Sequence, residues 1–264
     1  MHFSSLAETF KKLEGTPSRN SMTEILAELF KKASGDEIGK ICYLLQGRVA
    51  PLFEPIEFGV ADKFMIRAIA QAYGAEGSDV LRAFKKLGDL GAAAEKIKST
   101  NLQIYKSTNK KLSVSDVYNT LFEITQESGA GSQEKKITLL AELLKNVDAL
   151  STRYIARIPL DKLRLGFSDM TMLDSLSWMI TGDKSLRGKL EDAYNVRPDI
   201  GYIAQTVKER GIAGLGAVKA KIGVPILPAL CQRLKSADEM IKKMGTVAVE
   251  HKYYGTMVQI HYQF

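Results

Sequence analysis

Apolar residues recur at spacings of three and four along residues 1–222, and this periodicity constrains the fold more than any other feature. Phe3, Leu6, Phe10 and Leu13 show it at the very start of the chain. Such spacing puts apolar side chains on one face of an α-helix. The sequence therefore predicts a mainly α fold. The expected helices cover residues 25–30, 38–45, 61–73, 79–87, 89–99, a stretch capped by Ser115, 133–144, 152–158, 171–181, 185–194 and 200–207.

The helical spacing of apolar residues ends after the last of these helices. Glycines between Gly211 and Gly216, then Pro225 and Pro228, interrupt the helical spacing. We place a domain boundary here, with a helical domain over 1–222 and a second segment over 223–264. Residues 247–252 and 257–262 alternate around a turn at Tyr254 and Gly255, which predicts a short β-hairpin.

The charge balance narrows the classes of partner. Lys and Arg number 37 against 30 Asp and Glu, so the net charge is +7. An excess of this size favours a polyanionic partner without requiring one. Cys42 and Cys231 lie far apart and the histidines do not cluster, so we expect no metal site. No apolar run is long enough for a membrane span, and we expect an intracellular protein, cytoplasmic or associated with the nucleoid in a prokaryote.

One candidate phosphate site lies at residues 129–136. Gly131 and Ser132 open an expected helix, and Lys135 and Lys136 follow within its first turn. Free backbone amides and the positive end of a helix favour an anion at such a position. The alternative is an ordinary flexible connection between two helices, with Ser132 as a cap.

A second candidate lies at residues 162–171. Gly166 allows a close backbone approach, Lys162 and Arg164 supply positive charge, and Thr171 is a candidate cap for the next helix. The alternative for Arg164 is a surface salt bridge, which is common and contributes little energy.

The expected hairpin carries a lysine motif. Glu250, Lys252 and Gly255 match the pattern Glu-x-Lys-x-Asp-Gly-x-Arg, whereas Tyr254 and Met257 replace its aspartate and arginine. This segment resembles the nucleophile motif of the covalent nucleotidyltransferases, which include DNA ligases, RNA ligases and capping enzymes. A deprotonated lysine amine in such a motif attacks the α-phosphorus of ATP. The alternative is an exposed lysine of an edge strand.

Three further stretches, taken in order, are more specific than the lysine motif. They are YLLQGRVAP at 43–51, LRLGFSDMTMLD at 163–174 and GVPILPAL at 223–230. Together they resemble landmarks of the N-terminal DNA-binding domain of archaeal and eukaryotic replicative ATP-dependent DNA ligases. In that family the third stretch leads through a helix into the nucleotidyltransferase domain, so the resemblance covers essentially the whole chain.

The resemblance implies a function in DNA replication, repair and recombination. It implies contacts to the phosphate backbone of nicked double-stranded DNA, made by Gly131, Ser132, Lys135, Lys136, Lys162, Arg164, Gly166 and Thr171. Lys252 would accept AMP, Glu250 would recognise adenine and Gly255 would shape the turn. The full-length family uses ATP and Mg²⁺, and a sliding clamp is a possible partner of a monomeric enzyme.

The departures at Tyr254 and Met257, and the few catalytic motifs within the chain, predict that it does not ligate by itself. A freestanding, non-catalytic DNA-binding module would show the same residues and stays open as an alternative. A helical scaffold for protein partners is disfavoured by the order of the landmarks and the positive charge.

Overall fold

The computed structural model describes residues 1–101, 111–163, 165–228, 233–251, 253, 255 and 258–262. These residues are mainly helical, as the apolar spacing predicts. The helices are α1 (Phe3–Glu14), α2 (Arg19–Lys32), α3 (Gly35–Leu45), α4 (Asp62–Tyr73), α5 (Gly77–Leu87), α6 (Leu90–Asn101), α7 (Val114–Gln126), α8 (Ser132–Lys145), α9 (Ala149–Arg157), α10 (Asp169–Thr181), α11 (Arg187–Val196), α12 (Ile200–Arg210), the 3-10 helix η1 (Ile212–Ala217) and α13 (Ala237–Met244).

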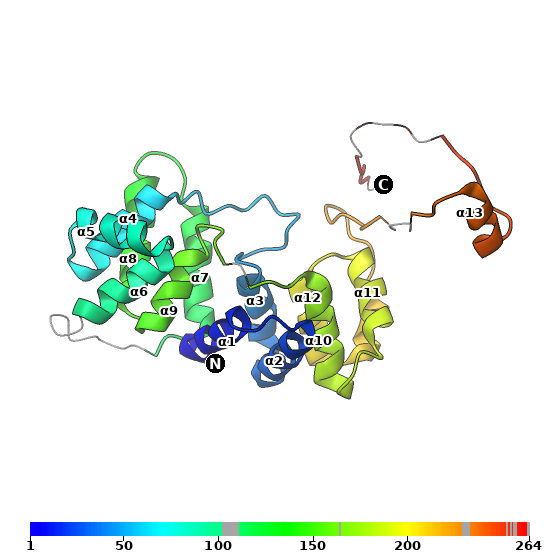
Figure 1. Ribbon diagram of the computed structural model, residues 1–264, viewed down its shortest axis with the longest axis horizontal. Helices are drawn as coiled ribbons and strands as arrows, with labels where there is room; N and C mark the ends of the chain where they lie inside the picture. Colours follow the sequence, from blue (N-terminus) through cyan, green and yellow to red (C-terminus); the bar gives the residue numbers. More distant parts are fainter. Residues whose placement is uncertain are drawn as a thin grey trace.

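The helices form two groups that lie side by side (Figure 1). In one group α4 packs on α8, and α6 packs on α9 and α5. In the other α2 packs on α10, and α3 packs on α12. Helix α1 contacts both α9 and α2, and α7 contacts both α8 and α3. These two helices therefore join the groups into one helical body.

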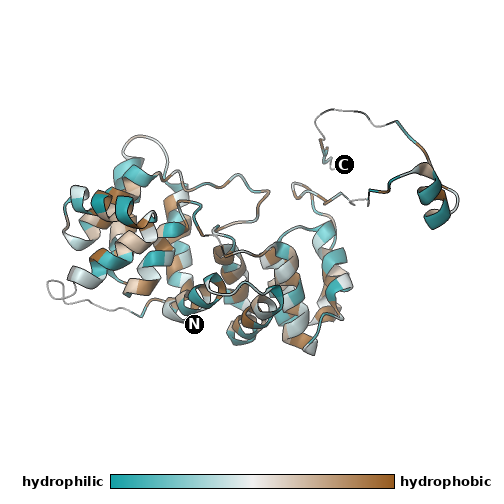
Figure 2. Cartoon of the chain, in the orientation of Figure 1, coloured by the Kyte–Doolittle hydropathy of each residue, from teal (hydrophilic) through white to brown (hydrophobic). Residues whose placement is uncertain are grey.

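The apolar faces of the helices meet in the interior. Phe3, Leu6, Phe10 and Leu13 are all buried, which confirms the periodicity expected for the first helix. The Phe10 ring meets the ring of Tyr154 from α9 edge-on, with 5.2 Å between centroids. Figure 2 shows α3, which lies centrally, as one of the most hydrophobic helices. Burial of such side chains is the main favourable term in folding.

Local capping residues decide where several helices begin. The prediction that Ser115 caps this helix is wrong, because Ser115 lies inside α7 and Ser113 is its N-cap residue. Ser113 and Asp116 form a reciprocal capping box, with the Ser113 hydroxyl accepting from the Asp116 amide at 3.1 Å. Thr171 is likewise not a cap, since α10 begins at Asp169 with Ser168 at the N-cap position.

The segment after Pro228 differs from the helical body. Helix α13 buries no residue and stands apart from the other helices in Figure 1. No strand is assigned to the described residues of 247–262, so the β-hairpin stays a prediction. Upstream, Val224 is still buried and the Leu227 amide donates to the Asn195 carbonyl at 2.9 Å. The boundary at 222 also stays a prediction.

Candidate nucleic-acid interface

The connection between α7 and α8 carries the first candidate site. Gly129 and Gly131 have φ values of 82° and 79°, a left-handed conformation that glycine adopts without strain. Gly131 is the N-cap of α8, so Ser132 is its first helical residue. No described residue accepts a hydrogen bond from the amides of Gln133 and Glu134. These donors at a positive helix end suit an anion.

Both lysines of this first site already have partners within the chain. The Lys135 ammonium donates to Glu127 at 2.5 Å, and this hydrogen bond raises the pKa of the exposed lysine. The Lys136 ammonium donates to the Phe58 carbonyl at 2.7 Å. An anion at the start of α8 therefore has to compete with Glu127 for Lys135, whereas Lys136 ties α8 to the segment between α3 and α4.

The second candidate site lies between α9 and α10. Lys162 and Gly166 are exposed, and Gly166 has a φ of 80°. Thr171 is only 8% exposed in the first turn of α10, so its side chain presents little surface to a ligand. Arg164 lies outside the described residues. Of the four predicted contacts, Lys162 and Gly166 thus lie on the surface.

Hydrogen bonds hold the first sequence landmark against the second. Gln46, at the end of α3, donates its side-chain amide to Asp169 Oδ1 at 2.6 Å. Asp169 Oδ2 accepts from the Tyr194 hydroxyl of α11. Burial and this carboxylate raise the pKa of Tyr194, so the phenol stays protonated as the donor. The loop that carries Gly166 is thus fixed from two helices.

A second tyrosine, Tyr43, links α3 to α12 by a hydrogen bond. The Tyr43 hydroxyl donates to Asp199 Oδ1 at 2.6 Å, and the Tyr202 amide donates to the same oxygen at 2.9 Å. Burial raises the pKa of Tyr43, and the Asp199 carboxylate raises it further. Asp199 is also the N-cap residue of α12. One carboxylate therefore starts α12 and orients α3.

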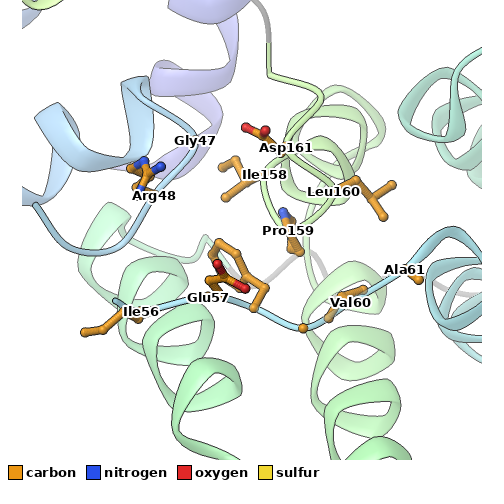
Figure 3. Close-up of a pocket in the computed structure, with 12 residues that line it drawn as sticks. Gly47, Arg48, Ile56, Glu57, Val60, Ala61, Ile158, Pro159, Leu160 and Asp161 are labelled. Carbon is orange, nitrogen blue, oxygen red and sulfur yellow. The ribbon is translucent and has the colours of Figure 1, made fainter. Parts of the chain in front are cut away.

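Two hollows lie between these loops. The central hollow, about 480 Å³, is lined by Gly47, Arg48, residues 56–61 and residues 158–161 (Figure 3). The Gly166 hollow, about 300 Å³, is lined by Leu45, Gln46, Arg48, Leu52, Leu163, Leu165, Gly166, Phe167 and Asp169. Arg48 lines both. Lys136 of α8 reaches Phe58 on the wall of the central hollow, and Asp169 at the start of α10 lines the Gly166 hollow, so the starts of both helices adjoin the two hollows.

Arg48 is a candidate contact residue that sequence reasoning did not single out. It is part of the first landmark, but the pattern of a helical end gave no reason to single it out. Its side chain is half-buried and forms no hydrogen bond or ion pair with any described residue. The signal that could have found it is an arginine directly after Gly47, whose φ is 71°.

The predicted catalytic segment forms no enclosed site among its described residues. Lys252, Tyr254 and Met257 lie outside the described residues, and Glu250 and Gly255 are exposed. None of the described residues of 247–262 is buried. The Gln259 side chain nevertheless exchanges two hydrogen bonds with the backbone of Ile226, at 2.9 and 2.6 Å.

In the described part of the chain, His, Cys, Asp and Glu side chains nowhere gather in groups of three or more that could hold a metal ion. Among the same residues, every helix is too short or too polar to cross a bilayer.

Comparison with known proteins identifies similar chains. Residues 2–177 match the family model described as DNA ligase N terminus. The chain is 42% identical over 261 residues to a probable DNA ligase of Dictyoglomus turgidum, covering 99% of this chain and 44% of that protein. It is 41% identical to DNA ligase 2 of Thermofilum pendens, with 98% and 44% covered, and 39% identical to the DNA ligase of Saccharolobus solfataricus, with 99% and 45% covered. The chain thus spans less than half the length of these relatives.

Proposed function

Because the chain belongs to the ATP-dependent DNA ligase family and corresponds to its N-terminal region, we propose that it binds nicked double-stranded DNA through the phosphate backbone. In this role it serves ligation during DNA replication, repair and recombination. The ligand is the duplex, and its proposed binding surface comprises the starts of α8 and α10 with the two hollows between them.

The observation that carries the proposal is the geometry of that surface. The unpaired amides of Gln133 and Glu134 lie at one end, and exposed Gly166 and Lys162 lie toward the other. Backbone donors and a glycine without a side chain suit the sugar-phosphate backbone, which carries no sequence information itself. Binding of this kind is tolerant of sequence, as an enzyme that finds nicks at any position requires.

Positive charge supports the proposal, but the lysines of the surface contribute unequally. The net charge of +7 attracts a duplex at long range. At the surface itself, Lys162 is exposed, whereas Lys135 shares its charge with Glu127. We therefore expect a modest number of phosphate contacts from this region, with the remainder of the enzyme adding more.

Titration of a labelled nicked duplex tests the proposal. Neutralising about three phosphates gives a slope of about −2.7 for log K against log salt, which is about a 40-fold loss of affinity between 50 and 200 mM. Fluorescence anisotropy with duplexes of three unrelated sequences measures both quantities. A flat salt response, or binding confined to one sequence, would contradict the proposal.

We further propose that catalysis needs more than this chain. Lys252 is proposed as the AMP acceptor, with Glu250 contacting adenine and Gly255 shaping the turn, and ATP and Mg²⁺ are proposed as cofactors of the full-length enzyme. Tyr254 and Met257 remove a carboxylate and a cation from the family pattern, and each group that acts electrostatically in such a reaction contributes a few kcal/mol. The test is incubation of the protein with labelled ATP and Mg²⁺. A labelled protein band that disappears in Lys252→Ala would overturn the prediction that the chain is inactive.

The departures at Tyr254 and Met257 also favour a second candidate, a non-catalytic DNA-binding module. It would occupy nicked DNA through the same surface as a monomer. Joining the chain to the remaining domains of the Dictyoglomus turgidum relative separates the candidates. Ligation by that fusion supports the ligase role, and its absence together with unchanged DNA affinity supports the module.

A further inference from the structure

Arg48 occupies an unusual position between the two hollows. It follows Gly47 at the end of α3, and its amide donates to the Tyr43 carbonyl at 2.9 Å, which fixes its backbone. Its half-buried guanidinium has no acceptor among the described residues, whereas Gln46 and Asp169 on the wall of the neighbouring hollow are hydrogen-bonded to each other. A partly desolvated cation without a partner is costly unless a ligand supplies one.

The carboxylates nearby indicate on which side a ligand would lie. Glu57 and Asp161 line the central hollow, opposite Arg48 in Figure 3, and neither forms an ion pair with it. These charges disfavour an anion deep in that hollow. In the Gly166 hollow the carboxylate is Asp169, and both its oxygens already accept hydrogen bonds, from Gln46 and Tyr194.

We propose that Arg48 binds a phosphate group of one DNA strand at the mouth of the Gly166 hollow. This inference rests on the proposed function, because it adds a further contact to the same duplex-binding surface. A guanidinium presents two parallel N–H donors that match two phosphate oxygens, and it keeps its charge at every working pH. Gly166, which is exposed and lines the same hollow, leaves room for the backbone of the strand.

The surrounding hydrogen bonds hold this site in place before DNA arrives. Gln46 and Tyr194 fix Asp169 at the start of α10, and Tyr43 fixes α3 on α12. Arg48 therefore lies at the start of the connection from α3 to α4, directly after a helix that is anchored on α12. A site that is already ordered loses little conformational entropy on binding.

Three variants test the proposal: Arg48→Gln, Arg48→Lys and the control Arg82→Gln. Arg82 lies on α5, where its side chain is 78% exposed and pairs with Asp79. The control therefore removes the same charge at a position outside the proposed DNA-binding surface. Binding of the nicked duplex is measured by anisotropy across a salt series. We expect Arg48→Gln to weaken binding about tenfold on every sequence and to make the salt slope less steep by about one.

The other two variants test whether the effect requires the guanidinium group and its position. Arg48→Lys keeps the charge but loses the two-donor geometry, so we expect an unchanged salt slope with a loss of about threefold. Arg82→Gln should match the parent in affinity to within a factor of about two, because only the long-range attraction changes. The urea midpoint of each variant reports whether it folds.

The outcomes separate this inference from the proposed function. A parent chain that does not bind the duplex overturns the proposed function and this inference together. A parent that binds with a steep salt slope, alongside Arg48→Gln with the same affinity and slope, overturns only the role of Arg48. Arg48→Gln and Arg48→Lys could also lose equal amounts of affinity while the salt slope of both stays unchanged. That result would show that Arg48 has a structural role only, and it would overturn the inference.

Discussion

Gly201 shows how one missing side chain sets the distance between two helices. A Cβ atom at this position of α12 would come within 2.7 Å of the Tyr43 hydroxyl oxygen, which is closer than a real contact. The absence of that atom lets the Tyr43 ring approach α12 and reach Asp199. The close approach of α3 and α12 thus depends on this glycine, together with Gly39 of α3, where an added Cβ would lie 3.2 Å from the Gly201 carbonyl oxygen.

We expect Gly201→Ala to lower the free energy of unfolding by about 1–3 kcal/mol, because the tyrosine has to leave its position or the helices have to separate. Urea unfolding followed by circular dichroism measures the change. Gly188→Ala in α11 is the matched control, since a Cβ there meets nothing within 4 Å. That substitution should raise stability by about 0.5–1 kcal/mol. Equal effects in the two variants would refute the steric explanation.

Lys98 is a buried cation with a structural use. Its side chain is 5% exposed, and its ammonium donates to the Leu144 carbonyl at 2.9 Å at the end of α8. It also lies over the Tyr73 ring, 5.2 Å from the centroid. Burial lowers the pKa of Lys98 from 10.5 to about 8, against the smaller opposing influence of Asp148. The lysine therefore joins α6 to α8 at an electrostatic cost.

The pKa of Lys98 predicts a pH-dependent stability. Between pH 8 and 10.5 the unfolded chain binds more protons at this lysine than the folded chain does, so the stability of the folded state rises with pH in that window. The unfavourable contribution is complete below pH 8 and disappears toward pH 10.5. Unfolding free energies at pH 7.5, 9 and 10 should therefore rise relative to Lys98→Met. Parallel profiles for the two chains would show that Lys98 does not titrate there.

At the scale of elements, the capping box of α7 links a local signal to the joint between the two helix groups. The Ser113 amide donates to Asp116 Oδ2 at 2.8 Å, and hydrogen bonds from Ser113 lower the pKa of Asp116. Helix α7 contacts α8 on one side and α3 on the other. Fraying at its start would loosen both contacts.

We expect Ser113→Ala to lower the free energy of unfolding by about 1 kcal/mol, the usual effect of losing an N-cap oxygen. Ser115→Ala is the comparison, since Ser115 lies inside the helix, where its hydroxyl accepts a hydrogen bond from the Lys40 ammonium at 3.1 Å. Chemical denaturation of both variants in a Lys40→Met background, which removes that bond, measures the difference. In this background, a loss from Ser115→Ala as large as that from Ser113→Ala would contradict the cap at Ser113.

The helices could be predicted because their signal is local. Apolar residues recurring at three- and four-residue spacing located the helices α1 to α12, although α2 begins at Arg19, six residues before the expected start at residue 25. Burial of Phe3, Leu6 and Phe10 follows from spacing alone. The start of α7 was misplaced by two residues because Ser113 and Ser115 compete in the sequence. The acidic residue three positions later, which only Ser113 has, decides between them.

The candidate site was less predictable because its partners are distant in sequence. Lys136 bonds to Phe58, 78 residues away, so its attachment to the α3–α4 segment is invisible in the sequence. Lys135 pairs with Glu127 across the glycine turn rather than at a helical spacing. The missing partner of Arg48 likewise appears only when the walls of both hollows are assembled.

For the whole molecule, the helical body and the segment after Pro228 have unequal shares in stability. The described core residues lie at or before Val224, whereas α13 buries none. A chain ending at Pro228 should therefore unfold within about 2 °C of the full chain, since little buried area is lost. It should also bind nicked DNA with the same salt slope. A large drop in either quantity would place part of the core, or part of the DNA-binding surface, in the deleted segment.

The hydrogen bond from Lys136 to the Phe58 carbonyl has a consequence for the way the molecule answers its ligand. An ammonium carries three N–H donors, so Lys136 can contact a phosphate of an incoming strand while it keeps its bond to the Phe58 carbonyl. A strand bound at the start of α8 would then be joined through one side chain to the connection between α3 and α4, where Arg48 lies.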